Sequence, residues 1–71
     1  MIDGASGWSK DRVREEIQSR RDRLASVERE YNQVREEWIA EGCPPQRPMW
    51  HYWTNQMGQL RTEINDLISL L

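Results

Sequence analysis

The strongest constraint on this chain is the segment Gly42-Cys43-Pro44-Pro45-Gln46-Arg47-Pro48. Proline lacks a backbone N–H, its ring clashes with the preceding helical turn, and it restricts the residue before it. A helix therefore cannot continue through three prolines in five residues. Because apolar residues repeat with helical spacing on both sides, the sequence predicts an all-α, antiparallel two-helix coiled-coil hairpin with a proline-rich turn over residues 42–48.

The apolar residues before the turn form one heptad series, whose steps alternate between four and three residues. Ser9 is the predicted N-cap and Gly42 the left-handed residue that closes the helix, so we expect this helix over residues 9–41. Residues 1–8 contain two glycines and are expected to form a flexible lead-in. The series consists of Val13, Ile17, Leu24, Val27, Tyr31, Val34 and Trp38, with Arg20 in its one polar position.

The second series has no polar interruption. Pro48 suits the first position of a helix, and the expected helix covers residues 48–71. Gly58 falls on its outer face, where glycine costs about 1 kcal/mol relative to alanine. The core positions are Trp50, Trp53, Met57, Leu60, Ile64, Leu67 and Leu71.

The two series also predict a register, because a positions layer against d positions in an antiparallel pair. This register places Glu41 near Trp50 and Arg20 near Leu71. On the flanks, Glu28 faces Arg61 favourably, whereas Glu30 faces Glu63 unfavourably. The expected layers are Trp38/Trp53, Val34/Met57, Tyr31/Leu60, Val27/Ile64 and Leu24/Leu67.

A single seam between two helices is a small core for 71 residues, so we expect the hairpin to dimerise into a four-helix bundle. In the expected register the first helix overhangs the second, which leaves Val13 and Ile17 without an intrachain partner. Ile68 and Leu70 widen the apolar face near the C-terminus. The expected self-association residues are Val13, Ile17, Arg20, Ile68, Leu70 and Leu71.

The flanking charges are separated by sign. Basic residues follow one edge, and Glu16, Glu30, Glu37 and Glu63 follow the other, so a second copy can pair its acidic edge with the basic edge of the first. The alternative is an ordinary solvated surface. For Arg20 we expect a packed stem with a guanidinium in water at the bundle end; the alternative is an ion pair with a second chain's carboxylate, such as Glu16.

The residue inventory argues against catalysis. The chain has one His and one Cys, and its sequence shows no metal-ligand spacing, no phosphate loop and no nucleophile with a base. We therefore expect no enzyme activity, no cofactor and no metal. With no secretion-signal pattern and no apolar run of membrane-spanning length, we expect a cytoplasmic protein without membrane contact.

The expected function is a protein-interaction module, such as an adaptor, an assembly factor or a small inhibitor of a larger protein. Its loop end is a candidate binding surface, because the register turns apolar side chains outward there. These loop-end residues are Ile39, Arg47, Met49 and Tyr52. The alternative function is binding of RNA or DNA along one Arg-lined edge, although the net charge of −2 gives it little support. That edge consists of Arg14, Arg21, Arg35 and Arg61.

Overall fold

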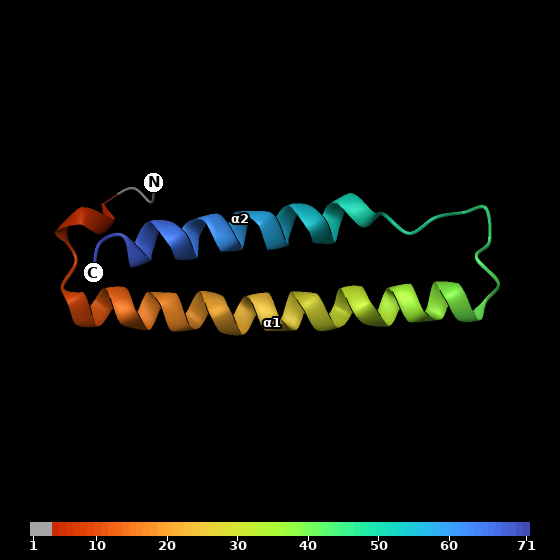
Figure 1. Cartoon of the computed structure of the whole chain (residues 1–71), viewed down its shortest axis with the longest axis horizontal. Helices are drawn as coiled ribbons and strands as arrows, with labels where there is room; N and C mark the ends of the chain where they lie inside the picture. The colour runs from red at the N-terminus through yellow and green to blue at the C-terminus, as the bar shows by residue number, and fades with distance from the viewer. Residues whose placement is uncertain (1–3) are drawn as a thin grey trace.

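The computed structural model describes residues 4–71 and shows two helices packed side by side in antiparallel directions (Figure 1). Helix α1 spans Lys10–Ala40 and helix α2 spans Trp50–Ile68, joined by a long connector over residues 41–49. A short 3₁₀ helix, η1 (Ala5–Gly7), precedes α1 and folds back beside the end of the hairpin that holds the C-terminus. The predicted hairpin is confirmed.

Both ends of α1 lie where the sequence predicts them. The Ser9 hydroxyl accepts a hydrogen bond from the Arg12 backbone N–H at 3.2 Å, as an N-cap does. At the other end, Gly42 has φ of 84°; its N–H bonds to the Ile39 carbonyl and the N–H of Cys43 bonds to the Trp38 carbonyl, each at 3.0 Å. These two bonds form a Schellman motif, which requires the left-handed residue that glycine supplies.

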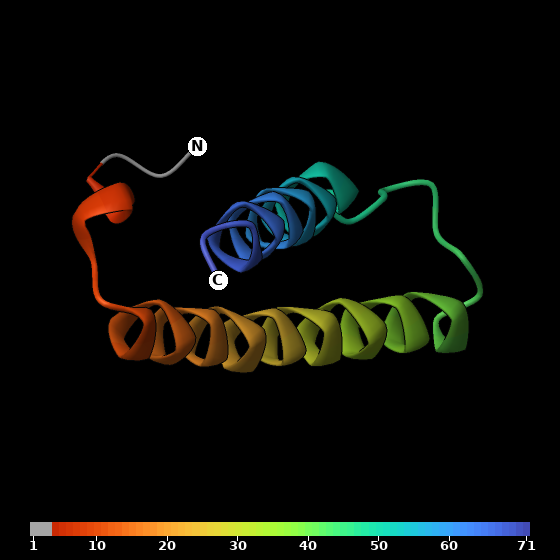
Figure 2. The same cartoon turned by 60° about the vertical axis from the view of Figure 1, so that its left-hand side comes forward.

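Helix α2 is shorter than expected at both ends. Its first helical residue is Trp50 instead of Pro48, because Met49 has a non-helical ψ of 76° and its side chain makes no cap bond. The last helical residue is Ile68, and residues 69–70 form a turn. The connector is consequently longer than the expected turn, and it runs extended along the overhanging end of α1 before α2 begins (Figure 2).

The buried side chains form two clusters along the seam. The terminal cluster contains Ala5, Val13, Ile17, Ile64 and Leu67. The middle cluster contains Val27, Met57 and Leu60, with Tyr31 and Trp53 packed against it. Leu24 touches both clusters. The core therefore lies between η1 and the start of α2, and the connector end of α1 extends beyond it.

The expected register is wrong by about one heptad. Val27 packs with Met57 and Leu60 instead of Ile64, and the Tyr31 ring meets Trp50 with centroids 5.7 Å apart. Met57 lies one heptad before Ile64, so every a and d residue stays in the seam while α2 moves toward the N-terminus of α1. Trp50 consequently lies beside Tyr31 and Trp38, away from its expected place next to Glu41.

The shifted register corrects two further expectations. Val13 and Ile17 have intrachain partners: they are only 1% and 5% exposed, and they pack against Ile64 and Leu67. Ala5 is also 1% exposed in this cluster, and Trp8 packs against it. The expected lead-in thus contributes to the core from residue 5 onward, whereas residues 1–3 lie outside the described part of the chain.

Within residues 4–71, neither helix combines the length and the apolar character required to cross a bilayer.

Candidate functional site

The connector and the overhanging end of α1 enclose an open groove of about 680 Å³. One wall is the last part of α1 and the other is the proline-rich connector. The Trp38 indole N–H donates to the Pro44 carbonyl at 3.2 Å and so ties the two walls together. The groove, which we call the connector groove, is lined by Val34, Glu37, Trp38, Glu41, Pro44, Pro45, Gln46, Arg47 and Pro48.

The α1 wall of the connector groove is acidic and aromatic. Glu37 lies in the last turn of α1, Glu41 is the C-cap residue directly after the helix, and both line the groove together with Trp38. Glu37 accepts a hydrogen bond from the Gln33 amide at 3.3 Å. Among residues 4–71, no cation lies within ion-pair distance of either carboxylate.

The predicted loop-end residues lie around this groove or on the nearby surface. Arg47 lines the groove, and Ile39, Met49 and Tyr52 are all more than half exposed, Met49 reaching 76%. The Tyr52 ring stands edge-on to Trp53 at 5.3 Å between centroids. The structure thus places these apolar groups at the solvent surface, and their role in binding stays a prediction.

Aromatic side chains brace the base of the connector. The Trp50 ring contacts Tyr31 and Trp38 edge to face, with centroids 5.7 Å apart in each case. Such pairs contribute about 0.5–1.5 kcal/mol beyond their burial. The indole N–H of Trp53 is buried and has no acceptor among the described residues. Sequence reasoning found the aromatic residues but not their partners, because the partners depend on the register.

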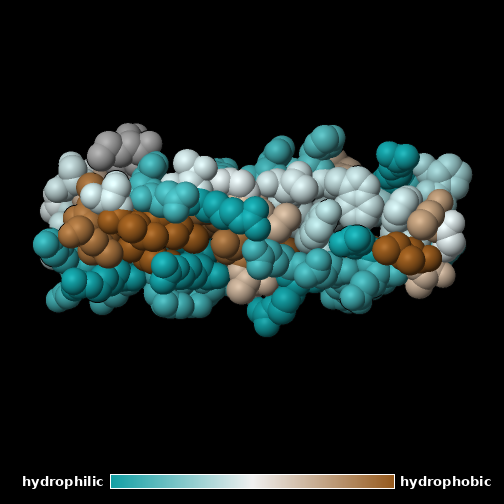
Figure 3. All heavy atoms as spheres, in the orientation of Figure 1, coloured by the Kyte–Doolittle hydropathy of each residue, from teal (hydrophilic) through white to brown (hydrophobic). Residues whose placement is uncertain are grey.

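A second apolar surface lies at the end of the hairpin that carries the C-terminus. Figure 3 shows an apolar stripe that follows the junction of the two helices over this end, and a smaller apolar patch at the connector end. Ile68 and Leu71 are exposed to 43% and 47%, and Leu70 is half-buried against the terminal cluster. Val13 and Ile17 are covered within the chain, so they offer no free surface for self-association.

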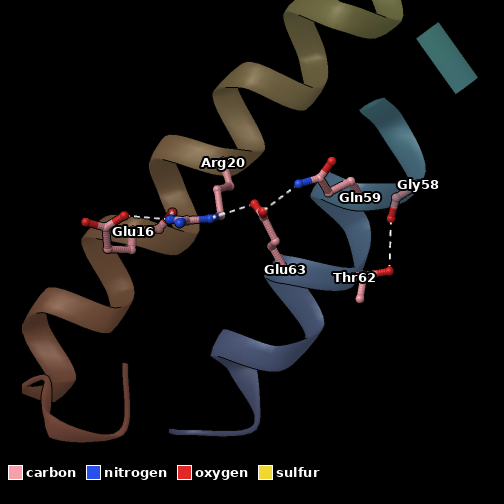
Figure 4. Close-up of polar contacts among 6 residues, drawn as sticks. All are labelled: Glu16, Arg20, Gly58, Gln59, Thr62 and Glu63. Atoms are coloured by element: carbon pink, nitrogen blue, oxygen red, sulfur yellow. Dashed lines mark hydrogen bonds and ion pairs between the residues drawn. The ribbon is translucent and has the colours of Figure 1, made fainter. Parts of the chain in front are cut away.

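Arg20 lies in the seam between the terminal and middle clusters. Its Nε donates to Glu63 Oε2 at 3.1 Å and its Nη1 donates to Glu16 Oε2 at 2.5 Å, as Figure 4 shows. The hydrogen bond to Glu16, with a further contribution from Glu63, raises the pKa of the Arg20 guanidinium, although desolvation acts in the opposite direction. Because its side chain is 21% exposed and both carboxylates belong to its own chain, the expected place beside Leu71 at the bundle end is wrong.

Glu63 continues this polar network onto α2. Its Oε1 accepts a hydrogen bond from the Gln59 amide at 3.3 Å. Glu63 therefore faces Arg20 and Gln59, and the expected repulsion with Glu30 is replaced by an attractive pair. The expected contact between Glu28 and Arg61 is present at 3.2 Å. A small polar hollow of about 120 Å³ beside the network is lined by Arg23, Gln56, Gln59, Leu60 and Glu63.

The four arginines of the alternative nucleic-acid edge are not equivalent. Arg14 pairs with Asp11 at 3.1 Å, and Arg61 pairs with Glu28. Arg21 and Arg35 are exposed and, among the described residues, have no ion-pair partner. Two of the four charges are thus partly balanced within the chain, and nucleic-acid binding stays a prediction.

In the described part of the chain, no three His, Cys, Asp or Glu side chains come close enough together to hold a metal ion. Cys43 is exposed in the connector.

Comparison of the chain with family models, curated proteins and solved structures finds no match.

Proposed function

We propose that this protein is a non-enzymatic protein-interaction module that pairs with a second copy as a four-helix bundle and binds a larger protein through its connector end. The observation that carries this proposal is the shape of the chain. Its extents are 50 × 17 × 13 Å and its radius of gyration is 15.8 Å. A compact chain of this length has a radius of gyration of about 11 Å.

The solvent-accessible surface area also supports self-association. It measures 5432 Å², whereas a compact monomer of 8.5 kDa exposes about 4,700 Å². The excess is close to the roughly 800 Å² that each partner buries in an interface of standard size. A second hairpin laid along the open seam covers surface of this kind, and Ile68 and Leu71 supply exposed apolar side chains at the terminal end.

The connector end supplies a separate surface for the larger partner. Met49, Tyr52 and Ile39 are exposed there, and aromatic and Met side chains are common anchors at protein interfaces. Because this surface lies at the other end of the hairpin from Ile68 and Leu71, the two associations do not compete for the same residues. Such a division is compatible with an adaptor, an assembly factor or a small inhibitor.

Self-association is tested by light scattering on a sizing column, across protein concentration and with reductant present to keep Cys43 reduced. We expect a mass that rises with concentration toward twice the 8.5 kDa of the chain. The double variant Ile68→Ser/Leu71→Ser should stay monomeric, whereas the control Ile39→Ser, which removes an exposed apolar side chain at the connector end, should still dimerise. A wild-type monomer at every concentration contradicts the self-association.

Partner binding is tested by affinity capture from extracts of the native cells. Met49→Ser/Tyr52→Ser should lose a protein that the wild-type chain retains, and Ile68→Ser/Leu71→Ser should keep it. If both double variants retain the same proteins, the connector end is not the partner surface.

A further inference from the structure

We infer that the connector groove binds an arginine side chain presented by a segment of the partner protein. This inference rests on the proposed function and specifies the chemistry of the partner. Its first support is charge. Glu37 and Glu41 line the groove without a cationic partner among residues 4–71, and Arg47 is the one cation in the lining. The lining therefore has two negative charges against one positive charge.

The position of these carboxylates at the C-terminal end of α1 is the second support. A helix carries partial negative charge at its C-terminus, where Lys, Arg or His is favoured and a carboxylate is disfavoured. The last turn of α1 contains no basic residue, and Glu37 and Glu41 lie at this end. Residues that oppose a local preference, as these carboxylates oppose the helix dipole, are often found at functional positions. A cation from a partner would be attracted by both carboxylates and by the partial negative charge at this end of the helix.

The third support is the combination of acidic and aromatic groups. Trp38 lies in the same wall as the carboxylates, and its ring is held by the bond to Pro44 and by the edge-to-face contact with Trp50. A guanidinium stacks on aromatic faces and pairs with carboxylates in a planar fork, whereas an ammonium does neither as well. Val34 and the proline wall suit apolar residues on either side of the arginine.

The same features favour a cationic protein segment over an anionic ligand or an enclosed small molecule in this groove. Phosphate groups of a nucleic acid would be repelled by Glu37 and Glu41. The groove is open to solvent, whereas small-molecule sites usually enclose most of their ligand. We therefore assign the occupant to a protein segment, and a second copy of this chain becomes an outcome of the test.

The test uses two blocked peptides, Gly-Leu-Arg-Leu-Gly and the same peptide with citrulline, which has nearly the shape of arginine but no charge. Binding is followed at low salt by the NMR signal of the Trp38 indole N–H, because this proton bonds to Pro44 across the groove. We expect the arginine peptide to bind about tenfold more tightly than the citrulline peptide, which matches a cation–π contact with one or two exposed ion pairs. At physiological salt the difference should shrink.

Two double variants are compared, and each removes two negative charges from the chain. Glu37→Gln/Glu41→Gln should abolish the preference for arginine, whereas Glu30→Gln/Glu36→Gln, which removes two exposed carboxylates of α1 outside the groove, should preserve it. The inference is overturned if wild type binds both peptides equally, or if the two double variants lose the preference to the same extent. A lower dimer mass for Glu37→Gln/Glu41→Gln alone would make a second copy the occupant and would also overturn it.

Failure here is distinguishable from failure of the proposed function. If the chain dimerises and captures a partner but does not prefer the arginine peptide, the proposed function is supported and the arginine-binding inference is contradicted. If the chain stays monomeric but still prefers the arginine peptide, self-association is contradicted and the arginine-binding inference is supported.

Discussion

The guanidinium of Arg20 on α1 meets the carboxylate of Glu63 on α2 across the seam, with Nε and Oε2 3.1 Å apart. The two side chains are 21% and 28% exposed, and they lie between the two apolar clusters. A polar layer of this kind specifies register in coiled coils, because any slip leaves a charged group facing apolar side chains. Arg20 and Glu63 are opposite each other only in the observed register.

We predict that this pair couples more strongly than an exposed one. A double-mutant cycle with Arg20→Met and Glu63→Gln, measured by urea unfolding, should give a coupling of about 1 kcal/mol. The control cycle uses Arg61→Met and Glu28→Gln, whose side chains are 59% and 43% exposed, and should give a few tenths of a kcal/mol at most. Equal couplings in the two cycles would show that Arg20 contributes no more than a surface charge.

The pH dependence of the Arg20 contribution follows from its raised pKa. A cationic group with a higher pKa in the folded chain stabilises fully below its unfolded pKa, and this stability is lost only as the pH rises through the folded value. Both values for arginine are strongly alkaline. The difference in unfolding free energy between wild type and Arg20→Met should therefore stay constant from about pH 6 to pH 10. A steady decline over that range would contradict the assignment.

The register itself can be read by NMR. We expect cross-peaks between the rings of Tyr31 and Trp50, whose centroids are 5.7 Å apart. The register expected from the sequence would instead bring the methyl groups of Val27 and Ile64 together, although these residues belong to different clusters in the structure. Strong Val27–Ile64 cross-peaks without Tyr31–Trp50 cross-peaks would favour the slipped pairing.

Two glycines should respond to alanine with opposite signs. At both Gly42 and Gly58 an added Cβ meets no atom within 4 Å, so packing does not distinguish them. Gly42 has φ of 84°, and Gly42→Ala should destabilise by about 1–2 kcal/mol. Gly58 lies within α2, and Gly58→Ala should stabilise by about 1 kcal/mol. Thermal unfolding of both variants checks the prediction, and a shift in the same direction for both would refute it.

Ala5 should be intolerant of charge although it lies near the N-terminus. It is 1% exposed in the cluster with Val13 and Leu67, so Ala5→Asp buries a carboxylate and should lower the unfolding free energy by about 2 kcal/mol or more. Ser6 is exposed, and the control Ser6→Asp should change it by at most about 0.5 kcal/mol. Similar values for the two variants would mean that η1 does not cover the core in solution.

Local chemistry was sufficient to predict the hairpin and both ends of α1, whereas both ends of α2 differ from the expectation. Three prolines stop a helix in any context, Ser9 caps by bonding a backbone N–H three residues away, and Gly42 closes α1 because it adopts a positive φ. The heptad spacing likewise identified the buried face, since Val27, Met57 and Ile64 all lie in the seam. Each of these inferences depends on neighbours within a few residues.

The register and the candidate groove were decided only by the tertiary structure. A heptad repeat coincides with itself when it slides by one heptad, so the pattern fits both pairings equally well. The observed pairing is selected by contacts far apart in the sequence: Ala5 closes the terminal cluster over Val13 and Ile17, and Arg20 reaches Glu63. The same shift leaves Trp38 and Glu41 beyond the start of α2, where the connector folds over them and forms the groove.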